Sequence, residues 1–356
     1  MNKLQQLRNK MKEKSLDAVI VLDNLNQHYL SDFSFTDGFL LVAQEEALLI
    51  TDFRYYEMAL NRANKEFKVL MPKNRNEVIS KFISDNCVKV MGFEGNYVSY
   101  SAYKNYTETF SEVEFVSVGN IFSELRMIKS QDEIDKMQRA QDITDKAYAH
   151  LLNMITPEMT EIDVAVEIEY AMRKFGADGA AFDTIAVSGD ASALPHGTPR
   201  MQKLKSGFLT MDFGAKLEGY LSDMTRTVVI GKADAEMKKL YNTVLDAQLA
   251  ALDFLCEGVD AGEADKVARD IIDSYPEFKG TFGHSLGHSI GLFVHETPGL
   301  SPRSFGIKLA AGQVTSVEPG IYIMGKYGCR IEDMVAILKD GVHNFTHSTK
   351  ELIEIY

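Results

Sequence analysis

The chain has 356 residues, which is enough for about two domains of ordinary size. Apolar residues make up 45% of the chain and charged residues 25%, the balance of a globular protein in water. Lys and Arg number 38 against 51 Asp and Glu, so the formal net charge is −13. Because a surface of this sign repels phosphate backbones, we expect no nucleic-acid partner.

The cysteines and the apolar runs bear on where the protein resides. Cys87, Cys256 and Cys329 form no CxxC pair and are too few for a disulfide scaffold. Residues 1–16 have the pattern of an amphipathic helix, without the apolar core of a signal peptide. No apolar run reaches the roughly 20 residues of a membrane span. We therefore expect a cytoplasmic protein with no membrane partner.

The first third of the chain alternates short strand and helix patterns, which is typical of an α/β domain. Apolar runs predict strands at residues 18–22, 38–42, 47–51, 69–71, 88–93 and 113–118. Helical periodicity between them predicts helices at residues 53–64, 76–85 and 101–110.

A change in composition just before Leu125 marks the predicted boundary between domains 1–124 and 125–356. Ser130 and Glu133 have the spacing of a capping box, so a helix is predicted to begin there. Two further helices are predicted at residues 160–175 and 235–256. Strands are predicted at residues 182–187, 208–213, 222–230, 313–318 and 330–338.

One predicted hairpin of the second domain carries two acidic residues. If its turn is centred between Leu217 and Glu218, Asp212 lies opposite Asp223. Opposed side chains share a face with their Cβ atoms about 5 Å apart, so two carboxylates repel each other unless a cation lies between them. A solvated strand face that carries two acids is the alternative interpretation.

A second predicted hairpin repeats this arrangement. A turn centred on Gly325 places Glu318 opposite Glu332. Glu332 is surrounded in the sequence by apolar residues of a predicted core strand, and acids are rarely buried without a partner. Two opposed acid pairs in one domain favour a cation site over two solvated faces.

Residues 282–296 contain three of the eight histidines, His284, His288 and His295. The glycines at 283, 287 and 291 disfavour a zinc-binding helix of the HExxH type and allow the backbone to approach a ligand closely. The segment is therefore predicted to be a Gly-rich strand or loop at a site. His196, which follows Leu-Pro and precedes Gly, is either part of that site or structural.

Five residues occur in an order that resembles the dinuclear metal signature of the pita-bread metallopeptidases, family M24: Asp212, Asp223, His288, Glu318 and Glu332. Motifs between about 195 and 333 are similar to those of the proline-specific branch of that family: LPHG, MDFG, GYLSDMTRT, GHSIGLFVHE, VEPGIY and CRIED. The N-terminal motifs YLSDF and TDFRY resemble a creatinase-type N-terminal domain. The resemblance implies an α/β N-terminal domain with a mixed sheet, followed by an α+β pita-bread catalytic domain.

The resemblance also implies how the ligands divide between two divalent metal ions. Asp223 and Glu332 bridge the ions, Asp212 completes one of them, and His288 with Glu318 completes the other. Four carboxylates and one imidazole form an oxygen-rich donor set, which favours Mn²⁺. Co²⁺, Fe²⁺ and Zn²⁺ are the alternatives.

In the family, a metal-held hydroxide attacks the bond between the N-terminal residue and proline. By resemblance, His196, His284 and His295 handle charge and protons, with His295 placed at the oxyanion. Glu318 shuttles a proton to the leaving nitrogen. Arg330 lies on the strand face of the second bridging ligand and holds a ligand carboxylate or the substrate; a structural salt bridge is the alternative.

We therefore expect an Xaa-Pro aminopeptidase that acts on proline-containing peptides and forms a homodimer, as related two-domain proline peptidases commonly do. A prolidase restricted to Xaa-Pro dipeptides is the main alternative. A methionine aminopeptidase normally lacks such an N-terminal domain. Creatinase and a non-catalytic binding protein of this fold are both disfavoured, because each is expected to lack part of the ligand set.

Overall fold

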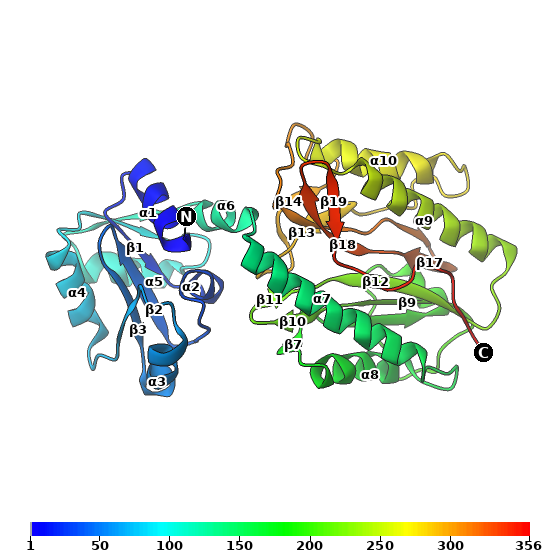
Figure 1. The fold of residues 1–356 in the computed structure, drawn as a ribbon, viewed down its shortest axis with the longest axis horizontal. Helices are drawn as coiled ribbons and strands as arrows, with labels where there is room; N and C mark the ends of the chain where they lie inside the picture. Colours follow the sequence, from blue (N-terminus) through cyan, green and yellow to red (C-terminus); the bar gives the residue numbers. More distant parts are fainter. Residues whose placement is uncertain (1) are drawn as a thin grey trace. The chain divides into compact units, whose positions relative to one another are not determined.

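A computed structural model describes residues 2–356. Its contacts divide the chain into two compact units, one ending at Arg126 and the other beginning at Met127 (Figure 1). The sequence analysis placed the domain boundary just before Leu125. Each unit has its own sheets and its own core, and each is described by itself.

The N-terminal unit contains a six-stranded sheet in the order β4-β3-β2-β1-β5-β6. β1 pairs antiparallel with β2 and parallel with β5, so the sheet is mixed, as expected. All six predicted strands are present, with small differences at their ends: β1 (Ala18–Val21), β2 (Gly38–Ala43), β3 (Ala47–Thr51), β4 (Lys68–Leu70), β5 (Val90–Phe93) and β6 (Glu114–Ser117).

Helices surround this sheet: α1 (Lys3–Glu13), α2 (Asn24–Ser31), α3 (Phe53–Arg62), α4 (Arg75–Asp85), α5 (Tyr100–Thr109) and α6 (Ile121–Met127). The sequence analysis missed α2 because polar residues occupy part of its buried face. Gln27 is fully buried, and its amide donates to the carbonyls of Val21 and Gly38. These bonds satisfy the amide nitrogen of a buried polar residue, and such a residue adds nothing to an apolar period in the sequence.

The C-terminal unit contains two pairs of long helices: α7 (Gln131–Leu152), α8 (Glu161–Lys174), α9 (Ala235–Phe254) and α10 (Ala261–Asp273). The predicted capping box at the start of α7 is present, with Ser130 and Glu133 each accepting from the other's backbone N–H. α10 was not predicted. Figure 1 shows the α7–α8 pair and the α9–α10 pair on opposite sides of the strands, so the sheets between them are enclosed.

The strands of this unit form several small sheets. A four-stranded sheet has the order β20-β12-β9-β8, and a five-stranded sheet has the order β14-β13-β15-β18-β19. The first contains β8 (Ile185–Ser188), β9 (Gly207–Phe213), β12 (Met224–Ile230) and β20 (Glu354–Ile355). The second contains β13 (Gly287–Ser289), β14 (Glu296–Leu300), β15 (Val314–Val317), β18 (Asp333–Leu338) and β19 (Gly341–Asn344). Short strands complete the unit: β7 (Gly179–Ala180), β10 (Ala215–Leu217), β11 (Tyr220–Leu221), β16 (Gly320–Ile323) and β17 (Tyr327–Arg330).

The register of the first acidic hairpin differs from the prediction. Its turn is formed by Glu218 and Gly219, whose φ angles of 50° and 86° are those of a two-residue type I′ turn. The centre therefore lies one residue later than predicted, and Asp212 is opposite Thr225 rather than Asp223. Asp223 lies in the break between β11 and β12. The residue opposite Asp212 is therefore two positions later than predicted. Because side chains alternate with a period of two, both acids remain on the predicted face.

The register of the second acidic hairpin is as predicted. β15 pairs with β18 so that Val317 is opposite Asp333, and β16 pairs with β17 so that Gly320 is opposite Arg330. Glu318 and Glu332 lie between these two ladders, and neither residue is paired in them. Their backbone N–H groups donate instead to carbonyls of other segments, those of Leu286 and Thr225.

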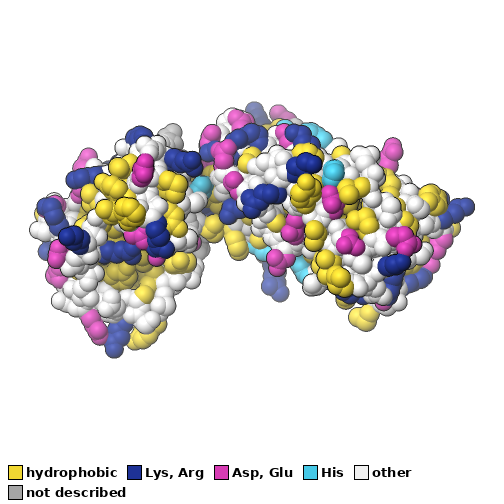
Figure 2. Space-filling view, turned by 90° about the horizontal axis from the view of Figure 1, so that it is seen from below, with side chains coloured by type: hydrophobic (Ala, Val, Ile, Leu, Met, Phe, Trp, Pro, Cys, Tyr) yellow, Lys and Arg dark blue, Asp and Glu magenta, His cyan; other side chains and the backbone are white. Residues whose placement is uncertain are grey.

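The surface shows a mixture of charges. Figure 2 shows Lys, Arg, Asp and Glu side chains interspersed on the visible face of each unit rather than gathered into one patch. Among residues 2–356, no helix combines the length and apolar character needed to cross a bilayer.

Candidate metal centre

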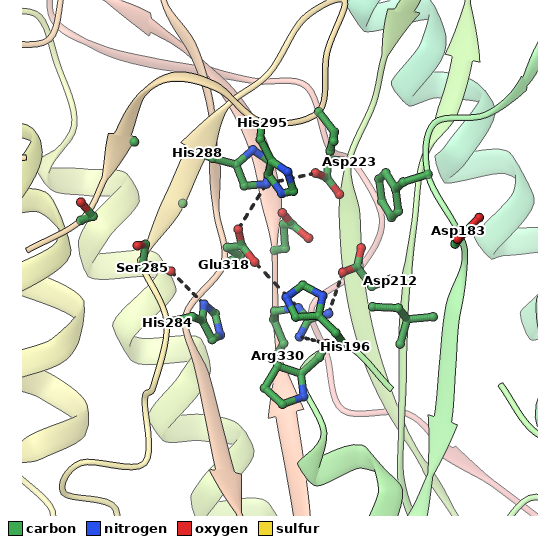
Figure 3. Close-up of a pocket in the computed structure, with 18 of the residues that line it drawn as sticks. Asp183, His196, Asp212, Asp223, His284, Ser285, His288, His295, Glu318 and Arg330 are labelled. Carbon is green, nitrogen blue, oxygen red and sulfur yellow. Dashed lines mark hydrogen bonds and ion pairs between the residues drawn. The ribbon is translucent and has the colours of Figure 1, made fainter. Parts of the chain in front are cut away.

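All the predicted site residues line one cavity of about 600 Å³ in the C-terminal unit (Figure 3). They are His196, Asp212, Asp223, His284, His288, His295, Glu318, Arg330 and Glu332. The carboxylates come from the two hairpins, and three of the histidines come from the Gly-rich segment around β13. The fold therefore brings together four stretches of chain that are far apart in the sequence.

Three of the predicted ligands form a compact cluster. One donor atom from each of Asp223, His288 and Glu332 lies within 4.8 Å of the other two. The Nε2 atom of His288 is 3.6 Å from Asp223 Oδ2 and 3.5 Å from Glu318 Oε1. These spacings are too long for direct hydrogen bonds but suit groups that surround a common ion.

Asp212 faces the same space, and Arg330 orients it. The Nη2 atom of Arg330 donates to Asp212 Oδ2 at 2.6 Å. The other carboxylate oxygen, Oδ1, is buried and has no hydrogen-bond partner within residues 2–356. A buried carboxylate oxygen without a partner is costly, so a cation at this position would satisfy it.

Thr225 links the guanidinium to a second acid of the cluster. The Nε atom of Arg330 donates to Thr225 Oγ1 at 2.9 Å, and that hydroxyl donates to Glu332 Oε2 at 2.7 Å. Arg226 holds the backbone at Glu332, because its Nη1 donates to the carbonyl of that residue at 2.6 Å. Arg226 is itself held by Asp333, at 2.8 Å.

The acids of the cluster destabilise one another's charged forms. Burial, followed by the charges of Asp212 and Glu318, raises the pKa of Asp223 well above its usual value. Burial and the charge of Asp223 likewise raise the pKa of Glu332. Burial raises the pKa of Glu318 to about 7. Groups so placed bind a proton or a cation in preference to remaining as bare carboxylates.

A chain of hydrogen bonds leads from Arg330 to His284. Arg330 Nη1 donates to the hydroxyl of Tyr322 at 2.8 Å, and that hydroxyl is 2.9 Å from Nε2 of His284. Nδ1 of His284 is 2.9 Å from the carbonyl of Ser285, so it is the protonated nitrogen and Nε2 accepts from Tyr322. Burial lowers the pKa of His284 to about 4, which keeps this imidazole neutral.

His295 and His196 complete the rim of the cavity. The ring of His295 stands edge-on to that of His288, with centroids 4.7 Å apart. Burial and the neighbouring His288 lower the pKa of His295. His196 follows Pro195, whose carbonyl accepts from Arg330 Nη1 at 3.2 Å. Both imidazoles therefore border the space in front of the acid cluster.

The sequence analysis assigned no role to Thr225 or Tyr322, although each lies within a motif that it singled out. Signals for both were present. Thr225 is two residues after Asp223, and Tyr322 is two residues after Gly320, the partner of Arg330. A period of two along each strand places these side chains on the faces that carry the site.

The donor set fits divalent cations. It offers four carboxylates and one neutral imidazole, since burial lowers the pKa of His288. Oxygen-rich sets of this kind suit Mn²⁺ and other hard or borderline ions. Bound cations would give the unpartnered oxygen of Asp212 a ligand contact. They would also offset the repulsion that, together with burial, raises the pKa values of three acids.

Comparisons with known families match both units. Residues 135–339 match the model described as metallopeptidase family M24. Residues 3–128 match the creatinase/prolidase N-terminal domain. Together these matches cover nearly the whole chain and confirm the expected pita-bread catalytic domain behind a creatinase-type domain.

Individual relatives agree with these matches. The chain is 36% identical to an Xaa-Pro dipeptidase of Pyrococcus furiosus over 99% of both chains. Its structure resembles an Xaa-Pro dipeptidase from Bacillus anthracis with a TM-score of 0.94 and 37% identity, covering 99% of both chains. It also resembles an X-Pro aminopeptidase from Thermotoga maritima with a TM-score of 0.92 and 35% identity, over the full length of both. The chain therefore belongs to metallopeptidase family M24 and is a hydrolase with a creatinase-type N-terminal domain.

Proposed function

We propose that this protein hydrolyses the bond between the first residue and proline at the free N-terminus of peptides, as an Xaa-Pro aminopeptidase. One observation carries the proposal: the five predicted ligands and the outer histidines converge on one cavity, in which Asp212 Oδ1 is buried without a partner. This arrangement is costly unless cations occupy it, and relatives that match the whole chain are named Xaa-Pro dipeptidase and X-Pro aminopeptidase.

The proposed ligands divide as follows. Asp223 and Glu332 would be shared by two ions, Asp212 would help to hold one, and His288 with Glu318 would help to hold the other. Mn²⁺ is the proposed metal, because four of the five ligands are carboxylates. When bound, two such ions would lower the pKa of a water molecule and polarise the scissile carbonyl.

Protein side chains then handle the proton and the developing charge. Glu318 would accept the proton of the attacking water and transfer it to the leaving proline nitrogen. His295, on the rim beside His288, would donate a hydrogen bond to the oxygen of the tetrahedral intermediate. Arg330 holds Asp212 in place rather than binding the substrate, since each of its three nitrogens already donates, to Thr225, Tyr322 and Asp212.

The walls of the cavity suit a proline ring. Phe182, Ile185 and Val294 line it with apolar surface, and His284 presents a neutral imidazole. Proline has no N–H to satisfy and a rigid apolar ring, so apolar walls of this kind can accept it. Phe293, which precedes Val294 in the chain, is not among the described residues that line the cavity and is 45% exposed.

A prolidase restricted to dipeptides is the second candidate, because relatives that match the full chain are named Xaa-Pro dipeptidases. Turnover of Ala-Pro, Ala-Pro-Ala and Met-Ala by the Mn²⁺-supplemented protein separates the alternatives. Cleavage of Ala-Pro-Ala supports the aminopeptidase, and cleavage of Ala-Pro alone identifies a prolidase. Cleavage of Met-Ala with neither proline peptide contradicts both.

A further inference from the structure

A buried ion pair that belongs to none of the predicted site residues lies directly behind the histidine segment. Lys129 Nζ is 2.9 Å from Glu296 Oε2, and the two side chains are only 2% and 4% exposed. Other ion pairs among the described residues of the C-terminal unit lie at the surface, such as Lys203 with Glu158, whose side chains are 68% and 78% exposed. Because desolvation of two charges offsets most of their attraction, a buried pair is weak evidence for a contribution to stability.

The position of this pair suggests another role. Glu296 directly follows His295 in the chain and begins β14. Lys129 directly precedes the N-cap of α7, and its own backbone N–H donates to the carbonyl of Gly312 at 2.8 Å. The backbone of Lys129 is therefore held by the start of α7 and by the hydrogen bond to Gly312. Glu296, in contrast, belongs to the segment that bends back toward the cavity.

That segment turns sharply between His288 and His295. The N–H of Gly291 donates to the carbonyl of Phe293 at 3.2 Å. The carbonyl of Gly291 accepts from the N–H of Leu221 at 2.9 Å. Leu221 is two residues before Asp223, so the turn is tied to the strand that leads into the acid cluster.

The ion pair packs directly against this turn. A Cβ atom on Gly291 would lie 2.9 Å from Glu296 Oε2 and 3.1 Å from Lys129 Cε. Because Gly291 has no side chain, its backbone packs directly against the ion pair. The ion pair in turn limits how closely the turn can approach the core.

The imidazole of His295 depends on this support. Within residues 2–356 it contacts the rings of His288 and Phe293 but forms no hydrogen bond. No polar partner therefore fixes its orientation, which leaves the two ring contacts and the backbone on either side of it to do so.

From these contacts we infer that Lys129 is a positioning residue: through Glu296 it holds the backbone at His295 and thereby sets the place of that imidazole beside His288. The consequence for catalysis rests on the proposed function, because it assumes that His295 stabilises the transition state. A displaced donor loses much of its effect, so kcat falls while KM changes little.

The direct test observes His295 itself. In protein labelled with ¹³C at the histidine rings, the His295 signal is assigned by its absence from a His295→Ala spectrum. Lys129→Met should shift or broaden this signal and leave that of His28, in the N-terminal unit, unchanged. Lys203→Met, which removes an exposed lysine, should move neither signal. An unchanged His295 signal in Lys129→Met overturns the inference.

Since Lys129→Met removes the positive charge that faces a buried carboxylate and can impair folding, the double variant Lys129→Met/Glu296→Met supplies a second test. We expect it to melt close to the parent protein while still showing a shifted His295 signal. With Ala-Pro-Ala, its kcat should fall roughly tenfold or more at nearly constant KM. Parent-like His295 signals and parent-like kcat in the double variant contradict the inference. If the parent protein cleaves no Xaa-Pro peptide, the proposed function fails, and the ring signals still decide the role of Lys129.

Discussion

Arg330 and Asp212 form the link between the two hairpins that carry the acids. Arg330 is the last residue of β17 and Asp212 lies near the end of β9, and Nη2 of the first is 2.6 Å from Oδ2 of the second. The guanidinium occupies one carboxylate oxygen and leaves the other, Oδ1, buried and facing the cavity. One fixed positive charge thus orients an acid and leaves its second oxygen available to a cation.

Replacement of this arginine tests the link. Arg330→Lys keeps the charge but loses the planar fork that reaches Asp212, Thr225 and Tyr322 together. A charge-assisted hydrogen bond contributes about 1.5–3 kcal/mol, so we expect kcat to fall roughly tenfold to a hundredfold. Steady-state kinetics with Ala-Pro-Ala measure the effect. Arg139→Lys, at an exposed pair with Glu218, is the control and should behave like the parent. Equal activities in the two variants contradict the role assigned to Arg330.

Removal of a bridging ligand tests the metal centre. Asp223→Asn keeps the shape of the side chain but removes the negative charge that two cations would share. We expect both metal content and activity to collapse, as measured by elemental analysis of the dialysed protein and by peptide turnover. Asp183→Asn, at an acid that lines the same cavity but is not a proposed ligand, should retain its metal. Retained metal and activity in Asp223→Asn would falsify the ligand assignment.

Chelation should act in the same way on the parent protein. Treatment with EDTA should abolish turnover, because without the ions nothing in the proposed mechanism lowers the pKa of the attacking water or polarises the scissile carbonyl. Addition of Mn²⁺ to the dialysed protein should restore it. Full activity after verified removal of all divalent metal contradicts the proposed mechanism.

The gain in stability on metal binding should grow as the pH rises. Burial raises the pKa of Glu318 to about 7, and burial with neighbouring charges raises those of Asp223 and Glu332. In the metal-free protein these acids bind protons more tightly folded than unfolded, so stability falls as the pH rises through the folded pKa values. Cations compete with those protons, so the gain in Tm on adding Mn²⁺ should grow between about pH 5 and pH 8. Calorimetry checks this; a gain that is independent of pH contradicts it.

The homodimer remains a prediction and is tested by mass. One face of α3 gives a physical reason for it, since Phe53 and Leu60 lie two helical turns apart on that face and are 85% and 46% exposed. Apolar side chains gathered on one helix face favour burial against another protein. Light scattering should give about twice the chain mass of 39.8 kDa. A mass of one chain contradicts the prediction.

Much of the fold could be predicted from local patterns. The six strands of the N-terminal sheet were found because each is a short apolar run between turns, and Ser130 with Glu133 located the start of α7. The second hairpin was placed in the correct register because Gly325, with φ at 72°, sits at the centre of its turn. α2 was missed because its buried face is partly polar.

In the first hairpin, the predicted centre of the turn was wrong by one residue. Gly219 accepts the positive φ that the second position of a type I′ turn requires, and this choice moves the centre of the turn. The change moved the partner of Asp212 from Asp223 to Thr225 but did not change its face. The alternation of side chains therefore preserved the predicted site although the pairing was wrong.

The sequence by itself determined which side chains are available for the proposed chemistry: the four acids, the imidazole of His288 and the histidines around them belong to motifs whose order is fixed along the chain. Only the tertiary structure decided which atoms of these residues meet. The contact of Arg330 with Asp212 and the support of Glu296 by Lys129 join segments more than a hundred positions apart. No local period records such contacts, because they arise when two sheets and their helices pack against each other and exclude water, which leaves buried charges to find partners wherever the packing places them.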